Sequence, residues 1–281
     1  MAKTCQLMRD SFQNWHTDQM GRSLFLGAPP RKIISLVPSQ TQLLADLGLE
    51  EQVVGLTRFC VHPKSWHDSK LRVGGTKDVR IDRIRALGPD LIIGNKEENV
   101  REQIEALEQE YPVWMSDIRT LDDALEMIRA IGNMTDRTEM ANALSSSILK
   151  RFGRLEDEVR QRAAFSTLYL IWKKPWMAAG SSTFIDRMLE LAGLPNVVKS
   201  QRYPELSPEE IQSLNPEVVL LSSEPYPFKT SHIEELQALL PRARKILCVD
   251  GEPFSWYGSR LADSPAYFSD LRKKIESPAA Y

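Results

Sequence analysis

One ten-residue pattern occurs twice in the chain and constrains the fold more than any other feature. It reads Ile-x-x-Leu-x-Pro-acid followed by three aliphatic residues, at 84–93 and again at 211–220, an offset of 127 residues. A helix ends before such a proline because proline disfavours helical geometry in the residue before it, and a short aliphatic run then forms a buried strand. The pattern therefore predicts the same helix-to-strand unit in two places.

Two further matches follow the same order along the chain. A Gly-Leu pair precedes a Val-Val pair in 48–54 and in 193–198, and a short apolar run precedes an aspartate in 113–117 and in 246–250. Short matches arise by chance, but three in one order favour a repeat. We therefore predict two copies of one α/β unit.

Between the copies lies the least interrupted helical pattern, from Asp136 to Ala163. Asp136 is the predicted N-cap, and Glu139 completes a capping box. About 28 residues at 1.5 Å per residue span roughly 40 Å, enough to connect two small lobes. Apolar residues recur at helical spacing on one face: Met140, Leu144, Ile148, Phe152, Leu155 and Val159.

These patterns predict an α/β fold of two lobes, each with a central, mostly parallel sheet flanked by helices, joined by one long rigid α-helix. The predicted boundaries are 1–30 for an N-terminal extension and edge strand, 31–134 for the N-terminal lobe, 135–164 for the interlobe helix and 165–281 for the C-terminal lobe. In detail, we expect an irregular lead-in over 1–16, a strand over 24–26 and a loop over 173–182.

Composition excludes several functional classes. A net charge of −2 gives no basic field for nucleic acid, and no run of about 20 apolar residues predicts a membrane-spanning helix. Three scattered cysteines predict neither a disulfide framework nor a zinc knot. We therefore expect no bound metal or cofactor held by the protein itself. We also expect a monomer.

The loops that follow the predicted strands are rich in aromatic and charged side chains. Ligands of parallel α/β sheets bind beyond the carboxyl ends of the strands. Aromatic residues make up only 8% of the chain, yet they crowd these loops in the second lobe. Flat faces with a few cations suit a broad ligand such as a macrocycle or a metal chelate. The alternative is that the aromatics close the sheet ends and pack against each other.

Catalytic signals are weak. The chain has no G-x-S-x-G, P-loop, Rossmann glycine or H-E-x-x-H motif. Glu97 and Glu98 are adjacent carboxylates, which a solvated pair at a helix start explains. Cys60 and His62 are close in sequence, whereas a nucleophile and its base usually meet across the fold. A metal site would need the convergence of His62, His67 and His232, and it stays an open alternative.

The chain resembles class III periplasmic binding proteins, the substrate receptors of ABC importers for cobalamin, ferric siderophores, haem and some metals. The resemblance covers about 250 residues from Thr17 onward. It is carried by 17–22 and 30–36 at the start, by the repeated Ile-x-x-Leu-x-Pro-acid segment and by the helix between the lobes. It is strongest to the cobalamin-binding receptors, in which aromatics at the places of Phe59, Tyr203 and Trp256 line the cleft.

The resemblance implies non-catalytic binding of a metal-containing macrocycle or chelate in the interlobe cleft, a corrinoid before a ferric siderophore or haem. It also implies delivery to an ABC importer permease dimer, with Asp82 and Glu209 as docking carboxylates and the loop from Lys174 to Gly180 closing over the ligand. The remaining alternatives are a chelatase-like enzyme and a cytoplasmic scaffold without a small ligand. The predicted ligand-binding residues are Arg58, Phe59, His62, Lys77, Lys174, Trp176, Tyr203, Glu224, Tyr226, Phe254, Trp256, Tyr257 and Arg260.

The start of the chain departs from the family. Family members carry a signal peptide or a lipoprotein cysteine before the position of Thr17. Here residues 1–16 are polar, and Cys5 has no apolar segment before it. As it stands, the sequence predicts a cytoplasmic protein, although the family is periplasmic or attached to the cell surface.

Overall fold

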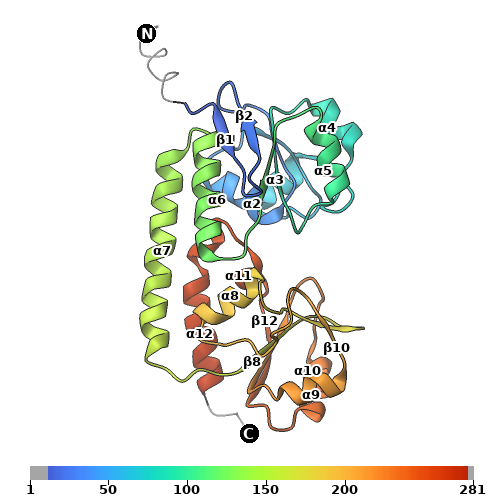
Figure 1. Ribbon diagram of the computed structural model, residues 1–281, viewed down its shortest axis with the longest axis vertical. Coiled ribbons are helices and arrows are strands. Elements are labelled where there is room, and N and C mark those ends of the chain that lie inside the picture. The colour runs from blue at the N-terminus through green and yellow to red at the C-terminus, as the bar shows by residue number, and fades with distance from the viewer. Residues whose placement is uncertain (1–11, 278–281) are drawn as a thin grey trace. The chain divides into compact units, whose positions relative to one another are not determined.

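The computed structural model describes residues 12–277, which divide into two units. Unit 1 consists of residues up to 118, residues 122–146 and the short segment 257–260, and unit 2 consists of 119–121, 147–256 and the residues from 261 onward. Figure 1 shows that each unit is built on a sheet with helices around it. The predicted class, two α/β lobes connected by a long helix, is the class observed.

The sheet of unit 1 has five parallel strands whose residues are mostly buried. Aliphatic side chains on both faces explain this burial, because helices cover a parallel sheet on both sides. The strand order is β5-β4-β3-β6-β7. The strands are β3 (Ile33–Ser35), β4 (Val53–Leu56), β5 (Leu71–Arg72), β6 (Leu91–Asn95) and β7 (Val113–Ser116). The helices that accompany them are α2 (Pro38–Asp46), α3 (Lys64–Ser69), α4 (Ile81–Leu87), α5 (Arg101–Glu108) and α6 (Leu121–Met134).

A hairpin of β1 (Trp15–Thr17) and β2 (Ser23–Phe25) precedes this sheet. The irregular lead-in predicted over 1–16 is wrong where it overlaps β1, and its first eleven residues lie outside the described part. Asp18 organises the turn, because its carboxylate accepts the backbone N–H groups of Met20 at 3.0 Å and Arg22 at 2.8 Å. Strand β1 is only three residues long, so its alternation of exposed and buried residues is too short to predict a strand from the sequence.

The sheet of unit 2 repeats this strand order as β10-β9-β8-β11-β12, but β9 and β10 run antiparallel to their neighbours. The loop predicted over 173–182 is therefore wrong in part, because 176–178 returns as a strand of a hairpin. Lys174 makes the turn with a φ of +67°. The strands are β8 (Thr167–Trp172), β9 (Trp176–Ala178), β10 (Glu205–Leu206), β11 (Val218–Ser222) and β12 (Lys245–Val249).

Three of the helices that lie wholly within unit 2 are α8 (Phe184–Leu191), α10 (Thr230–Leu239) and α12 (Ser264–Glu276). α12 is held by core side chains such as Phe268 and Leu271. The other helical segments are α9 (Pro208–Leu214), α11 (Glu252–Ser255) and the 3-10 turn η1 (Ser259–Ala262).

The repeated pattern is confirmed as a structural repeat. Helices α4 and α9 are each seven residues long and begin 127 residues apart, and strands β6 and β11 are each five residues long with the same offset. The expected capping box of α9 is present, because Ser207 accepts the N–H of Glu210 and Glu210 accepts the N–H of Ser207. Identical local sequence signals thus end a helix and begin a buried strand twice.

The connecting helix α7 (Thr138–Arg160) is shorter than predicted. Asp136 is not its N-cap, since it adopts a left-handed conformation with a φ of +56° just after α6. Ile148, Phe152 and Leu155 are buried as expected, but Met140 is exposed because the buried face begins at Ala141 instead. The apolar stripe therefore predicted the register over most of the helix but not at its first turn.

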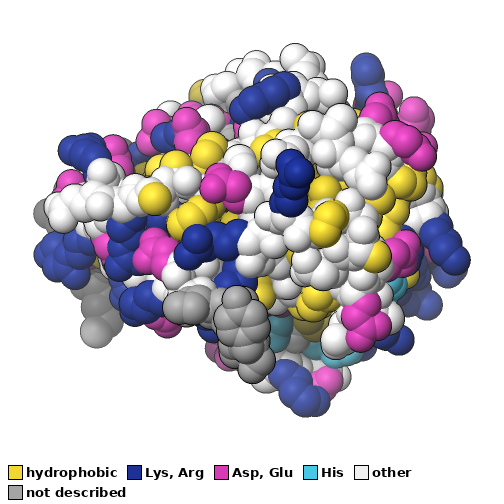
Figure 2. All heavy atoms as spheres, turned by 90° about the horizontal axis from the view of Figure 1, so that it is seen from below, with side chains coloured by type: hydrophobic (Ala, Val, Ile, Leu, Met, Phe, Trp, Pro, Cys, Tyr) yellow, Lys and Arg dark blue, Asp and Glu magenta, His cyan; other side chains and the backbone are white. Residues whose placement is uncertain are grey.

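The described surface is mixed in charge. Figure 2 shows Lys, Arg, Asp and Glu side chains interspersed on one face, with hydrophobic side chains in separate small groups. Among residues 12–277, no helix is long and apolar enough to cross a membrane.

Candidate functional site

The carboxyl end of β4 in unit 1 presents a flat apolar side chain beside a cation. The guanidinium of Arg58 lies 5.0 Å from the centre of the Phe59 ring and pairs with Asp78 at 3.1 Å. The side chain of Phe59 is 50% exposed. Because β4 belongs to a parallel sheet, both residues lie at the edge where ligands of such sheets bind.

Two further predicted residues of unit 1 lie near each other at this edge. Arg260 comes from the segment 257–260, which the chain contributes to unit 1 from far along the sequence. Partial burial and then the positive charge of Arg260 lower the pKa of His62. The imidazole is therefore neutral at pH 7, and such a ring accepts as well as donates hydrogen bonds.

Tyr257 belongs to the same segment and is held by a carboxylate. Its hydroxyl donates to Oε1 of Glu98 at 2.6 Å. Burial, followed by the negative charge of Glu98, raises the pKa of Tyr257 well above its ordinary value. Glu98 does not start a helix as expected, because α5 begins only at Arg101, and its carboxylate accepts the hydroxyl of this tyrosine instead.

The two lysines of this edge are already engaged. The Nζ of Lys77 donates to the backbone oxygen of Glu97 at 2.6 Å, and Lys96 pairs with Asp117 at 2.6 Å. Lys77 ties the 74–80 loop to the turn after β6. Its predicted role in ligand binding stays a prediction.

Unit 2 carries an aromatic cluster, which consists of Trp172, Trp176, Tyr226, Phe228 and His232. Trp176 and Phe228 are stacked with ring centres 6.1 Å apart, and Tyr226 contacts Phe228 at 4.8 Å and Trp172 at 5.4 Å. Trp172 is 39% exposed, whereas Trp176 is buried. The exposed part of the cluster thus follows the carboxyl ends of β8 and β11, while its inner part belongs to the core.

A second carboxylate organises the end of β11. Oε1 of Glu224 accepts the hydroxyl of Ser255 at 2.9 Å and the indole N–H of Trp256 at 3.2 Å. A Cβ at Gly251 would lie 2.4 Å from the Ser222 hydroxyl oxygen, so only glycine lets the α11 turn approach this strand end. Trp256 is thereby fixed at the place where the strand-end loops of unit 2 meet.

Four of the predicted ligand-binding aromatics are buried, namely Trp176, Phe254, Trp256 and Tyr257, and for Phe254 and Trp176 packing in the core of unit 2 corrects the prediction. Phe254 is fully buried, with ring contacts to Tyr169 at 4.9 Å and Phe268 at 4.7 Å. Trp176 is part of the hydrophobic core of unit 2. Alternation along β9 points its indole inward, so neither side chain presents a face to a ligand.

The remaining predicted residues of unit 2 lie in three places. Lys174 is exposed at the tip of the β8–β9 turn. Tyr203 is half-buried, with the guanidinium of Arg202 5.7 Å from its ring centre. Tyr226 is half-buried within the aromatic cluster.

A nucleophile–base pair of Cys60 and His62 is not formed. The thiol is buried and lies 3.0 Å from the Thr41 hydroxyl and 3.1 Å from the Thr57 hydroxyl. Burial raises the pKa of Cys60, which keeps the thiol protonated and unreactive. Within the described residues no group of three or more His, Cys, Asp or Glu is placed to hold a metal ion.

The two carboxylates that were predicted to dock a transporter occupy equivalent positions. Asp82 is the second residue of α4 and Glu209 the second residue of α9, and both are exposed. Backbone hydrogen bonding, and next a hydrogen bond with the Ser207 side chain, lower the pKa of Glu209. Desolvation by burial raises the pKa of Asp82. The hydrogen bond and the charge of Arg80 outweigh this effect, so the pKa of Asp82 is lowered. Both groups are therefore ionised at neutral pH.

Sequence reasoning missed two contributors to these edges. Trp172 was not among the predicted ligand-binding residues, although it is an aromatic residue at the last position of a buried strand. Glu98 was interpreted as a solvated helix-start residue, and nothing local in the sequence indicates its distant partner Tyr257.

Comparison with known proteins defines the class. Residues 33–244 match the family model described as "Periplasmic binding protein", and the chain belongs to this family. The chain is 24% identical over 201 residues to the vitamin B12-binding protein of Vibrio campbellii, covering 70% of this chain and 73% of that protein. It is 24% identical over 203 residues to the vitamin B12-binding protein of Pectobacterium carotovorum, at 70% and 73% coverage.

Solved structures share the fold. The periplasmic vitamin B12 binding protein BtuF of Vibrio cholerae has a TM-score of 0.78 at 21% identity, with 89% of this chain and 99% of that chain covered. A periplasmic heme binding protein of Pseudomonas aeruginosa has a TM-score of 0.75 at 22% identity, with 89% and 95% covered. Proteins of this family bind small-molecule ligands and deliver them to the permease of an ABC importer, as non-enzymatic components.

Proposed function

We propose that this chain is the substrate-binding component of an ABC importer and that its ligand is a metal-containing macrocycle, with a cobalamin-like corrinoid as the preferred candidate. The observation that carries the ligand class is the exposed ring of Phe59 with a guanidinium 5.0 Å from its centre, at the carboxyl end of a parallel sheet. Curated relatives named as vitamin B12-binding proteins support the choice of a corrinoid.

The residues suit such a ligand for chemical reasons. A corrin presents a broad apolar surface edged with amide groups, which aromatic faces and neutral hydrogen-bonding groups can contact. Phe59 supplies a face, and the neutral imidazole of His62 supplies a donor or acceptor. Binding requires no covalent step, so the protein acts as a non-catalytic receptor. We also propose that it acts as a monomer.

Calorimetric titration of the full chain with cyanocobalamin tests this proposal. Calorimetry is preferred to tryptophan fluorescence because cobalamin and haem absorb where tryptophan emits. We expect one site per chain with a micromolar or tighter dissociation constant. Heats no larger than those of dilution for cyanocobalamin, with saturable heats for haem or a ferric siderophore, would reject the corrinoid but keep the receptor.

Haem and ferric siderophores are the second candidates, because structural neighbours include heme-binding proteins and a protein of an Fe3+-hydroxamate transport system. Arg58, Lys77 and Arg260 place positive charge at this edge, which favours a ligand with carboxylates, although Arg58 already pairs with Asp78 and Lys77 already donates to the backbone oxygen of Glu97. Competition between cyanocobalamin and each alternative in the same titration ranks them.

A chelatase-like enzyme is the rival from another class. It would need a base facing the macrocycle, and the candidates are His62 with Glu97 or Glu98. Glu98 is already the acceptor of the Tyr257 hydroxyl at 2.6 Å. Incubation with protoporphyrin and ferrous iron should give no metalloporphyrin above the protein-free rate; formation that His62→Ala abolishes would establish the enzyme instead.

A further inference from the structure

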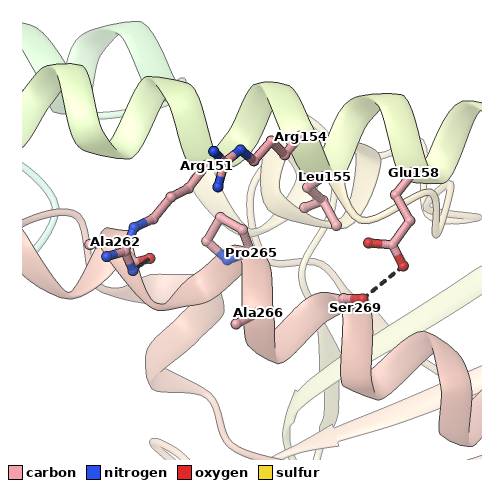
Figure 3. A pocket seen from close by; sticks show the side chains of 8 residues that line it. All are labelled: Arg151, Arg154, Leu155, Glu158, Ala262, Pro265, Ala266 and Ser269. Carbon is pink, nitrogen blue, oxygen red and sulfur yellow. Dashed lines mark hydrogen bonds between the residues drawn. The ribbon is translucent and has the colours of Figure 1, made fainter.

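A groove that lies between α7 and α12 in unit 2 is lined by one arginine, Arg154, without a partner among the described residues. Its volume is about 380 Å³, within the range of small-ligand pockets. Figure 3 shows its walls, which α7 forms on one side and the segment from Ala262 to Ser269 on the other. The residues are Arg151, Arg154, Leu155, Glu158, Ala262, Pro265, Ala266 and Ser269.

The floor of the groove is apolar. Leu155 is only 3% exposed, and Pro265 and Ala266 face it from the first turn of α12. Small side chains at 262 and 266 leave room between the two helices where larger residues would fill it. A hydrocarbon body is the occupant that such a floor favours.

The two ends of the groove differ in charge. At one end Glu158 accepts the Ser269 hydroxyl at 2.7 Å and pairs with Arg162 at 2.7 Å, so its charge is neutralised. At the other end Arg151 donates to the backbone oxygen of Ala262 at 2.8 Å and lies 3.6 Å from Asp263.

Arg154 is the exception among these charged groups. It has no hydrogen bond or ion pair with any residue of the range 12–277. Figure 3 shows its side chain lying along the wall toward Arg151 rather than out from the groove. The charge that remains without a counterpart in the groove is therefore positive.

We propose that this groove binds a small organic anion, with a carboxylate or similar group on Arg154 and a hydrocarbon body over Leu155, Pro265 and Ala266. The span from Arg151 to Glu158 along α7 is roughly 10 Å at 1.5 Å per residue. A carboxylate matches the planar fork of a guanidinium. The site is distinct from the strand-end loops and does not depend on the proposed importer function.

The probe is 4-phenylbutyrate, which has a carboxylate and a body of suitable length. We follow the backbone amide signals of Ala262, Ala266 and Ser269 in the ¹⁵N-labelled full chain by NMR. A ligand of this size is expected to bind with a dissociation constant on the order of 1 mM. Neutral 4-phenylbutanol should bind at least about tenfold more weakly, because it cannot form the charged hydrogen bonds.

Matched variants separate the groove from general charge effects. Arg154→Gln should weaken 4-phenylbutyrate binding about tenfold or more. Lys150→Gln removes the same charge from the same helix outside the groove and should change affinity by less than about twofold. Equal binding of the alcohol, equal losses in both variants, or shifts confined to other amides would each overturn the proposal, and the wild-type comparison needs no variant to fold.

Discussion

At the scale of single residues, Phe59 is the aromatic side chain that tests ligand binding with least disturbance of the core. Its ring is half exposed and is partnered by Arg58. We expect Phe59→Ala to weaken cyanocobalamin binding about tenfold, since a lost aromatic contact is worth roughly 1 kcal/mol or more. The free energy of unfolding should change by less than about 0.5 kcal/mol.

The control for this prediction is Val61→Ala, which shortens another exposed apolar side chain of the same loop. Calorimetry gives the affinity and urea denaturation gives the stability of both variants. If both variants bind cyanocobalamin like the wild type, Phe59 does not contact the ligand.

Tyr257 gives a prediction on pH. Burial and Glu98 raise its pKa in the folded state above the ordinary value near 10, so the stabilisation is complete below about pH 10 and is lost as the pH rises further. In that range the unfolded tyrosine loses a proton that the folded one keeps. The free energy of unfolding therefore falls by about 1.4 kcal/mol per pH unit for this residue.

Tyr257→Phe removes this contribution. We expect its stability to decline less steeply than that of the wild type above pH 10, by about 1.4 kcal/mol per pH unit. At pH 7 the variant should be less stable by about 1 to 3 kcal/mol, because a buried hydrogen bond to a carboxylate is lost. Urea denaturation at several pH values measures both effects, and parallel pH profiles would contradict the assignment.

The site residues were only partly predictable from the sequence. Phe59 lies just after β4 and is half exposed, as its place after an aliphatic run indicated, and its role in ligand binding stays a prediction. The same argument failed for Phe254, because the α11 turn rotates its ring into the core, and nothing local encodes that rotation. Glu98 and Tyr257 are 159 residues apart, a separation that only the fold brings together.

At the scale of elements, the hairpin of β8 and β9 replaces the loop that the sequence indicated. Its inner face carries Trp176, which stacks on Phe228, and its outer end carries the more exposed Trp172. Trp176→Ala should lower the free energy of unfolding by about 3 to 5 kcal/mol because it opens a cavity. Trp172→Ala should cost about 1 kcal/mol.

Urea denaturation of the two variants checks this difference. Similar losses would show that the two tryptophans are equally packed and that β9 does not have the described register. Cyanocobalamin affinity should respond to Trp172→Ala if the exposed edge of the aromatic cluster contacts the ligand.

Elements marked by a strong local sequence pattern were predictable. Strands whose position depends on hydrogen bonds to a neighbouring strand were not. The segments 84–93 and 211–220 carry a helix stop, a proline and an aliphatic run, and both folded as expected. Strand β9 is only three residues long, and its place depends on hydrogen bonds to β8 rather than on its own composition. Proline at 175 also favours a loop prediction.

At the scale of the whole molecule, both sheets place corresponding strands in the same order, with β3 and β8 at their centres. The units differ on one side only, where unit 1 has parallel β4 and β5 and unit 2 has the antiparallel β9 and β10. The repeated half of each sheet carries Asp82 or Glu209 at its helix start. The other half differs in strand direction, so the two predicted docking carboxylates lie in the part of each unit that is repeated.

Asp82 and Glu209 give the last prediction. Both are exposed, ionised and second in seven-residue helices, and a carboxylate in the first turn of a helix is favoured there in any case. If they also dock the importer, the double variant Asp82→Ala/Glu209→Ala should bind cyanocobalamin like the wild type. It should nevertheless deliver it to proteoliposomes containing a cobalamin importer at least about tenfold more slowly, since two charged contacts are lost.

The matched control is Glu51→Ala/Glu234→Ala, which removes one exposed carboxylate from each unit outside these helix starts. Uptake of radiolabelled cyanocobalamin measures delivery. A control that slows uptake equally would mean that only net charge matters, because general attraction to a basic permease surface depends on total charge and weakens with salt. Slower uptake of the Asp82/Glu209 variant alone, persisting at high salt, identifies two specific contacts.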